Sequence, residues 1–210
     1  DYALLHVEGL AEKSHLKMGD RLLVALPLLP QFEKDAGLGA HSIKRVIKGA
    51  ELTGALAAHP LRGHGYDFDV PLLPGDFVTT EAGTGFVHIA PGHGEDDFNL
   101  GRAHNLPIPE TVNDDGTFTH HAPGFEGLHV FKAHTAVYAA MEAAGTLAAT
   151  GKLTHSYPHS WRSKKPVIFR ATPQWFIAMD DANAIRAKSL DAIAKTHFVP
   201  DAGRNRIGSM

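Results

Sequence analysis

The run Pro91-Gly92-His93-Gly94-Glu95 constrains the fold of this chain most. Proline lacks a backbone N–H and fixes its φ angle, and glycine opens backbone conformations that other residues avoid, so no strand continues through this run. Residues 84–90 before it alternate as a strand does, with Val87 and Ile89 on one face and His88 on the other. The sequence therefore predicts a strand that ends in a sharp turn.

Three acids, Glu95, Asp96 and Asp97, follow the turn and open segment 95–106, whose apolar spacing predicts a short helix. Carboxylates in a first helical turn suit the helix dipole. We expect His88 at the strand end and Asp97 in the first turn to flank one cavity. An imidazole and a carboxylate beside a Gly-rich turn can orient water, bind an ammonium group or accept a proton. The alternatives are ordinary helix capping and an ordinary surface histidine.

Short β-type runs separated by Gly and Pro turns make up much of the remaining chain. The patterns predict strands at 2–8, 21–26, 42–48 and 76–78, helices at 30–36, 133–144 and 181–195, a turn at 113–116 and a loop over 54–76. We expect a mainly β fold with peripheral helices (α+β), a barrel-like mixed sheet over residues 1–155, and a strand stalk with a helix over 156–210.

The composition limits the partners of this chain. Its net charge of −3 gives no general basic surface, so any RNA contact must be a local patch. Lys44, Arg45 and Lys48 form the best patch in the first half, with a solvated strand face as the alternative. Cysteine is absent, which excludes disulfides and thiolate metal sites. No apolar run approaches the roughly 18 residues of a membrane span.

Fifteen histidines raise the hypothesis of a His-rich metallohydrolase. No pair has the H-E-x-x-H spacing of a zinc helix, and the adjacent His120 and His121 suit opposite faces better than one metal. We therefore expect neither a metal nor another cofactor.

Three stretches carry a resemblance: GTGFVHIAPGHGEDDF at 83–98, HSYPHSWRSKKPVIFRATPQWF at 155–176 and GRNRIGSM at 203–210. They closely resemble bacterial isoleucyl-tRNA synthetase, a class I synthetase, and the resemblance covers essentially the whole chain. It implies the inserted editing domain, residues 1–155, and the segment that returns to the catalytic core, 156–210. The implied partners are the acceptor end of tRNA(Ile) and that core, in the cytoplasm. Valyl and leucyl relatives are the alternatives, but they differ at His88 and in the APGHG run.

The resemblance also implies roles for individual residues. Asp97 would hold the α-ammonium group of a mischarged amino acid, and His88 would line a side-chain pocket that admits valine and excludes isoleucine. Gly83 and Gly85 would let the terminal adenosine approach closely. Further substrate contacts are expected from Thr84, His93 and Asp96.

A physical limit on binding explains why such a site is needed. One methylene group is worth only about 1–3 kcal/mol in an apolar pocket, and isoleucyl-tRNA synthetase is itself the standard example of this limit. A second site must therefore hydrolyse Val-tRNA(Ile) after transfer. Attack by water requires no covalent protein intermediate.

The chain departs from the family pattern in several places. A threonine-rich strand like TTTPWT is expected just before Asp1, and the HIGH-type and KMSKS-type ATP signatures are missing. Ser160 and Ser163 stand where relatives often carry C-x-x-C, so no structural zinc is expected. Trp175 would pack against a catalytic domain. We expect a fragment that does not aminoacylate and edits weakly or not at all, with an inert module binding the tRNA acceptor end as the alternative.

Overall fold

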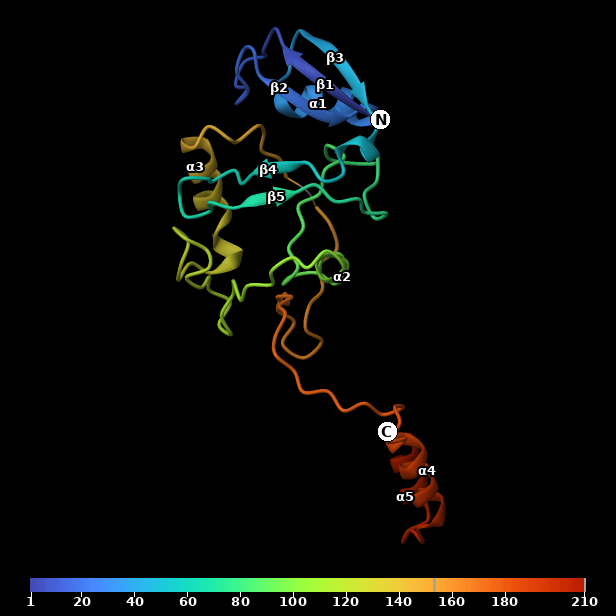
Figure 1. Ribbon diagram of the computed structural model, residues 1–210. Helices are drawn as coiled ribbons and strands as arrows, with labels where there is room; N and C mark the ends of the chain where they lie inside the picture. The colour runs from blue at the N-terminus through green and yellow to red at the C-terminus, as the bar shows by residue number, and fades with distance from the viewer. Residues whose placement is uncertain (153, 210) are drawn as a thin grey trace. The chain divides into compact units, whose positions relative to one another are not determined.

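The computed structural model describes residues 1–152 and 154–209. Contacts divide the chain into two compact units, Asp1–Ala171 and Thr172–Met210 (Figure 1). This division shows which residues pack together and does not assign a function to either unit. The assignment of residues 1–155 and 156–210 to an editing domain and a return segment stays a prediction.

The first unit begins with a three-stranded antiparallel sheet in the order β2-β1-β3. Alternate residues of the central strand, Ala3, Leu5 and Val7, are almost completely buried, as the period of a half-buried strand requires. Three predicted strands are therefore confirmed. Their bounds are β1 Tyr2–Val7, β2 Arg21–Ala25 and β3 His41–Ile47.

Helix α1 (Leu29–Ala36) covers one face of this sheet (Figure 1). Its buried Leu29 and Phe32 join the core formed by the sheet. A short 3-10 turn, Leu26–Leu28, precedes the helix. Gly37 ends the helix in the left-handed conformation, with φ 61°, and its N–H donates to Glu33 O. The predicted helix with a glycine stop is confirmed.

Residues 54–76, predicted as a loop, contain a second small sheet. Strands β4 (Leu56–Ala58) and β5 (Asp69–Pro71) pair antiparallel, and a 3-10 turn, Gly49–Leu52, precedes them. The prediction missed the pair because each strand is only three residues long. The strand predicted at 76–78 is wrong, since Val78 N–H donates to Gly75 O at 3.1 Å and closes a turn there.

Two further helices of this unit are confirmed, α2 (Glu95–Ala103) and α3 (His134–Ala143), the latter preceded by a 3-10 turn at Val130–Lys132. The apolar stripe of α3 is part of a second core, as predicted. The buried members of this core are Leu61, Ala122 and Phe125, against which Ala136, Val137, Ala140, Met141 and Ala144 pack. The predicted turn at 113–116 is also confirmed, because Gly116 N–H donates to Asn113 O at 3.0 Å.

The described residues form a mixture of small sheets and helices, with no closed barrel. The sheet orders β2-β1-β3 and β4-β5 share no strand. Closure requires a continuous ring of paired strands, and residues 84–90, predicted as a further strand, do not form one.

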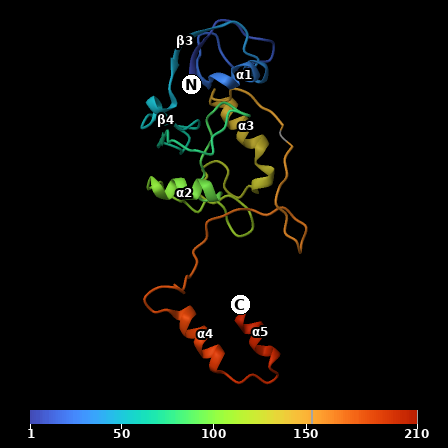
Figure 2. The same cartoon turned by 90° about the vertical axis from the view of Figure 1, so that its right-hand side faces the viewer.

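The second unit contains two helices, α4 (Ile185–Lys195) and α5 (Ala202–Gly208), which lie side by side (Figure 2). The helix predicted at 181–195 is confirmed, starting four residues later. Trp175 and Phe176 before it are 101% and 89% exposed. No helix in the described part of the chain is long and apolar enough to cross a membrane.

Candidate functional site

Residues 84–90 are not the strand that the alternation predicted. Gly83 and Gly85 have φ angles of +80° and +81°, which lie far outside the β region and bend the backbone at the start of the segment. Val87, expected on a packed face, is 53% exposed, and His88 is exposed too. His88 is therefore presented by an irregular segment.

The segment is nevertheless fastened to the first sheet. Ala25 N–H donates to Thr84 O at 2.8 Å, and the Tyr2 hydroxyl donates to Gly85 O at 2.8 Å. Gly85 is buried and leaves no room for a side chain, because a Cβ would overlap Ala25 Cβ and lie 3.1 Å from Tyr2 Cε1. The Phe86 ring lies 4.9 Å from the Tyr2 ring. The sheet thus fixes the Gly83-Thr84-Gly85 backbone.

His59 belongs to a small group of aromatic rings. His59 stacks on Tyr66 with ring centroids 4.5 Å apart and lies 5.1 Å from the Phe68 ring. Burial lowers the pKa of His59, and the nearby charge of His88 lowers this pKa further. His59 Nδ1 accepts the N–H of Leu61 at 3.1 Å, so His59 is held as the neutral Nε2–H tautomer.

Asp97 lies in the first turn of α2, where the helix dipole favours a negative charge. Gly94 is the N-cap residue, and the Asp97 carboxylate occupies the space that a Gly94 side chain would need. No hydrogen bond or ion pair of the described residues joins Asp97 to His88. The structure therefore places the carboxylate at the helix N-terminus and the imidazole on the irregular segment 84–90.

His93, predicted to contact substrate, forms hydrogen bonds at both ring nitrogens. Nδ1 lies 2.8 Å from Phe169 O, and Nε2 lies 2.5 Å from Thr111 Oγ1. A carbonyl oxygen only accepts, so Nδ1 carries the proton. These bonds make His93 a link between distant segments of the first unit.

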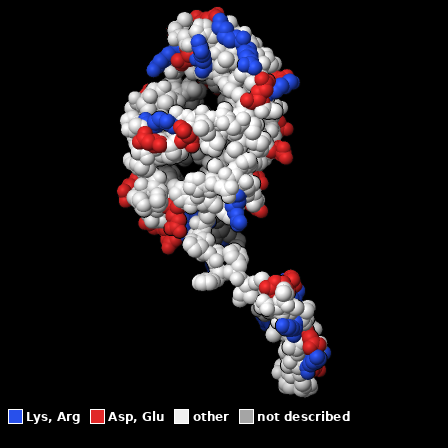
Figure 3. All heavy atoms as spheres, in the orientation of Figure 1, with Lys and Arg blue, Asp and Glu red and all other residues white. Residues whose placement is uncertain are grey.

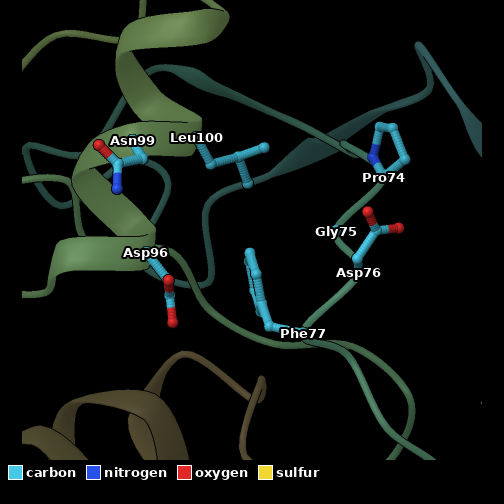
Figure 4. Close-up of a pocket in the computed structure, with 7 residues that line it drawn as sticks. All are labelled: Pro74, Gly75, Asp76, Phe77, Asp96, Asn99 and Leu100. Atoms are coloured by element: carbon cyan, nitrogen blue, oxygen red, sulfur yellow. The ribbon is translucent and has the colours of Figure 1, made fainter.

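Asp96 lines a pocket of about 350 Å³ between α2 and the loop 74–77. Leu100 points from the helix toward the loop, and Phe77 points from the loop back toward the helix (Figure 4). Neither Asp97 nor His88 lines this pocket. The remaining lining residues are Pro74, Gly75, Asp76 and Asn99.

The basic cluster of Lys44, Arg45 and Lys48, on β3 and directly after it, is neutralised by neighbouring acids. Lys44 lies 3.7 Å from Glu8, Arg45 lies 3.1 Å from Glu51, and Lys48 lies 2.6 Å from Asp1. Figure 3 shows basic and acidic side chains interspersed over the region of the first sheet. This arrangement favours the solvated strand face over a patch for RNA.

The described residues contain no group of three or more His, Cys, Asp or Glu side chains that could hold a metal ion. His120 and His121, which were expected on opposite faces, have ring centroids only 4.0 Å apart. The expectation of opposite faces is wrong. The two rings alone are too few ligands for a structural zinc site.

Sequence reasoning missed the residues that position the predicted site. Tyr2 contacts Gly85 across 83 positions, and His93 contacts Phe169 across 76. No local pattern signals such contacts. The aromatic partners of His59 left a weak signal in the sequence, because Tyr66 and Phe68 lie close together there.

A family model described as leucyl-tRNA synthetase, editing domain, matches residues 30–150. Over its whole sequence, the chain is similar to bacterial isoleucine–tRNA ligases. The ligase of Gluconobacter oxydans is 49% identical over 221 residues, with 100% of this chain and 23% of that protein covered. The ligase of Bradyrhizobium diazoefficiens is 45% identical over 237 residues, covering 100% and 24%. That of Pelagibacter ubique is 45% identical over 190 residues, covering 90% and 21%.

The chain spans about a quarter of the length of these relatives. Residues 83–97, which include every predicted site residue, lie inside the matched range 30–150. The family match and the motif therefore lie in the same part of the molecule.

Proposed function

Because the chain belongs to the family of the leucyl-tRNA synthetase editing domain, we propose that it hydrolyses, at the low rate expected of this fragment, the ester between a tRNA and a wrongly attached amino acid. The observation that carries this proposal is the family match across the segment that contains His88 and Asp97. In the reaction, water attacks the ester carbonyl carbon and the bond to the ribose oxygen breaks. A proton passes to that oxygen, which releases the tRNA and the free amino acid.

We propose tRNA(Ile) charged with valine as the substrate. The family model carries a leucyl name, but the relatives that match over 100% of the chain are isoleucine–tRNA ligases. Valine is smaller than isoleucine by one methylene, a difference that apolar binding alone discriminates poorly. An editing site that excludes isoleucine by size corrects this error.

The position of Asp97 supports a role in holding the substrate ammonium group. Its side chain is half-buried at the start of α2, and no lysine or arginine of the described residues forms an ion pair with it. An ammonium group that binds there gains a charge-assisted hydrogen bond. Asp97 would thus fix the amino acid with its ester carbonyl presented to water.

We propose that His88 limits the size of the amino acid side chain, and that Gly83, Thr84 and Gly85 contact the terminal adenosine. The support for the second role is that the Thr84 and Gly85 carbonyls are already bound to the sheet. Such fixed backbone is pre-organised for a ligand and loses little entropy on binding.

Further proposals concern the larger protein. The exposed Trp175, Phe176 and Ile177 support contact with the remainder of a ligase, because exposed apolar clusters mark interaction sites. A barrel-like arrangement of the editing domain and a cytoplasmic location are proposed on the resemblance to the family.

Hydrolysis of Val-tRNA(Ile) by paired variants tests the proposal. Asp97→Ala removes the carboxylate at the helix start, whereas the control Glu95→Ala removes an exposed acid in the same helical turn. We expect Asp97→Ala to lower kcat/KM at least about tenfold, as loss of a charged hydrogen bond predicts, and Glu95→Ala to change it less than about threefold. Equal effects would contradict the role of Asp97. Binding of tRNA without any hydrolysis would favour the inert acceptor-end module.

A further inference from the structure

We propose that His93 is a positioning residue, which holds the turn before Asp97 by tying it to residues 169–171. Residues 169–171 contact the 92–93 turn on one side and residues 111–114 on the other. We call these two sets of contacts the exit clasp. Ala171 is the last residue of the first unit. The exit clasp therefore lies where the chain leaves this unit, and all of its contacts lie within the unit.

Backbone and side-chain bonds fasten residues 169–171 on two sides. Ala171 N–H donates to Gly92 O at 2.7 Å, and His93 Nδ1–H donates to Phe169 O at 2.8 Å. On the other side Arg170 donates to Val112 O at 2.9 Å and pairs with Asp114. The Arg170 side chain is only 25% exposed, so its bond to Val112 O is partly shielded from water, whereas Asp114 is 97% exposed.

His93 is the residue that joins the two sides. Its Nε2 lies 2.5 Å from Thr111 Oγ1 while its Nδ1 holds Phe169 O. The Thr111 carbonyl in turn accepts a hydrogen bond from Thr119 N–H. This bond and the antiparallel bridge between Val112 and Phe118 make residues 111–119 a short hairpin. One imidazole thus connects the turn, residues 169–171 and the hairpin.

The turn transmits this restraint to Asp97. His93 directly precedes Gly94, the N-cap residue of α2, over which the Asp97 carboxylate lies. Pro91 packs so closely on the helix that a Cβ at Gly101 would lie 2.8 Å from Pro91 Cβ. Because the turn is held by the helix at Pro91 and by the clasp at His93, the start of α2 has little freedom. Figures 1 and 2 show α2 and the chain that precedes it.

The catalytic consequence of this inference depends on the proposed function, but the clasp itself does not. If Asp97 holds the substrate, a loosened turn misplaces its carboxylate relative to the ester, which lowers kcat. The KM for charged tRNA changes less than kcat, because the contacts proposed for Gly83, Thr84 and Gly85 with the terminal adenosine remain.

Amide hydrogen exchange on the full 210-residue chain tests the clasp directly. In His93→Ala we expect the amides of Ala171 and of Phe98, which bonds to Gly94 O, to exchange at least about fivefold faster, as the loss of one hydrogen bond predicts. The control His104→Ala removes an exposed histidine at the other end of α2 and should leave both amides unchanged. Faster exchange at Ala171 alone would overturn the proposal.

Two conservative variants separate positioning from folding. His93→Asn keeps a donor near the place of Nδ1 and should restore protection at Ala171, whereas His93→Gln keeps a polar group near Nε2 and should not. Hydrolysis of Val-tRNA(Ile) should show kcat reduced about fivefold in His93→Ala, with KM changed less than twofold and partial recovery in His93→Asn. Unchanged kcat with a loosened turn would overturn the link to Asp97. If the wild-type chain hydrolyses no aminoacyl ester, the proposed function fails and the exchange rates alone decide the clasp.

Discussion

Replacement of Gly85 by alanine should destabilise the first unit strongly. The φ angle of +81° costs a residue with a side chain about 1–3 kcal/mol. The new Cβ would also overlap Ala25 Cβ and lie 3.1 Å from Tyr2 Cε1, and such overpacking costs about 1–3 kcal/mol. The two effects together predict a loss of about 2–6 kcal/mol in the free energy of unfolding. Urea denaturation followed by circular dichroism measures it.

Gly83 provides the matched control. Its φ angle is +80°, but no atom lies within 4 Å of the position of an added Cβ. Gly83→Ala should therefore cost only the strain of about 1–3 kcal/mol. In the Gly85→Ala background, Ala25→Gly should recover part of the loss by opening space for the new methyl group. Equal losses in the two glycine variants would refute the packing of residues 84–86 on the sheet.

Three further perturbations give defined outcomes. Tyr2→Phe should lower the free energy of unfolding by about 0.5–1.5 kcal/mol, because Gly85 O loses its hydroxyl donor; an unchanged urea midpoint would contradict this bond. The pKa of His59 is lowered in the fold, so the unfolded chain binds a proton first as the pH falls below about 6.5, and stability declines there. His59→Phe should flatten this part of the pH dependence of unfolding, and an identical slope would count against it. In a Trp161→Phe background, acrylamide should quench the fluorescence of Trp175 as readily in the folded chain as in urea, because this ring is 101% exposed. Weaker quenching in the folded chain would contradict that exposure.

The individual strands of the first sheet and helix α1 could be predicted because their signals are local. Alternation buries Ala3, Leu5 and Val7, and Gly37 ends α1 in the left-handed conformation that glycine adopts most easily. The spacing of the α3 stripe likewise predicted which face of that helix packs. In each case one short stretch of sequence contains both the pattern and its physical cause.

Residues 84–90 show why alternation alone can mislead. Their pattern suits a strand, but the positive φ angles of Gly83 and Gly85 and the close contact with Ala25 determine the observed backbone. The short strands β4 and β5 escaped prediction for a related reason. Three residues give too few repeats for a period to be recognised.

A candidate site could be proposed from its motif, but the contacts that hold its residues in place could not be predicted. The run from His88 to Asp97 matches a known family, and that family is shown by the comparisons. The bonds of His93 to Phe169 and of Tyr2 to Gly85 join residues far apart in the sequence. Such pairs depend on the whole fold, so no local pattern in the sequence could predict them.

The ratio of hydrolysis rates for valyl and isoleucyl esters of tRNA(Ile) tests the proposed editing activity most directly. The same chain is mixed with each ester in turn, and initial rates are compared at equal concentrations, so the ratio does not depend on the absolute activity. We predict at least about tenfold faster release of valine, the discrimination expected when one methylene is excluded. Equal rates for the two esters, or faster release of isoleucine, would contradict an editing site that selects the smaller amino acid.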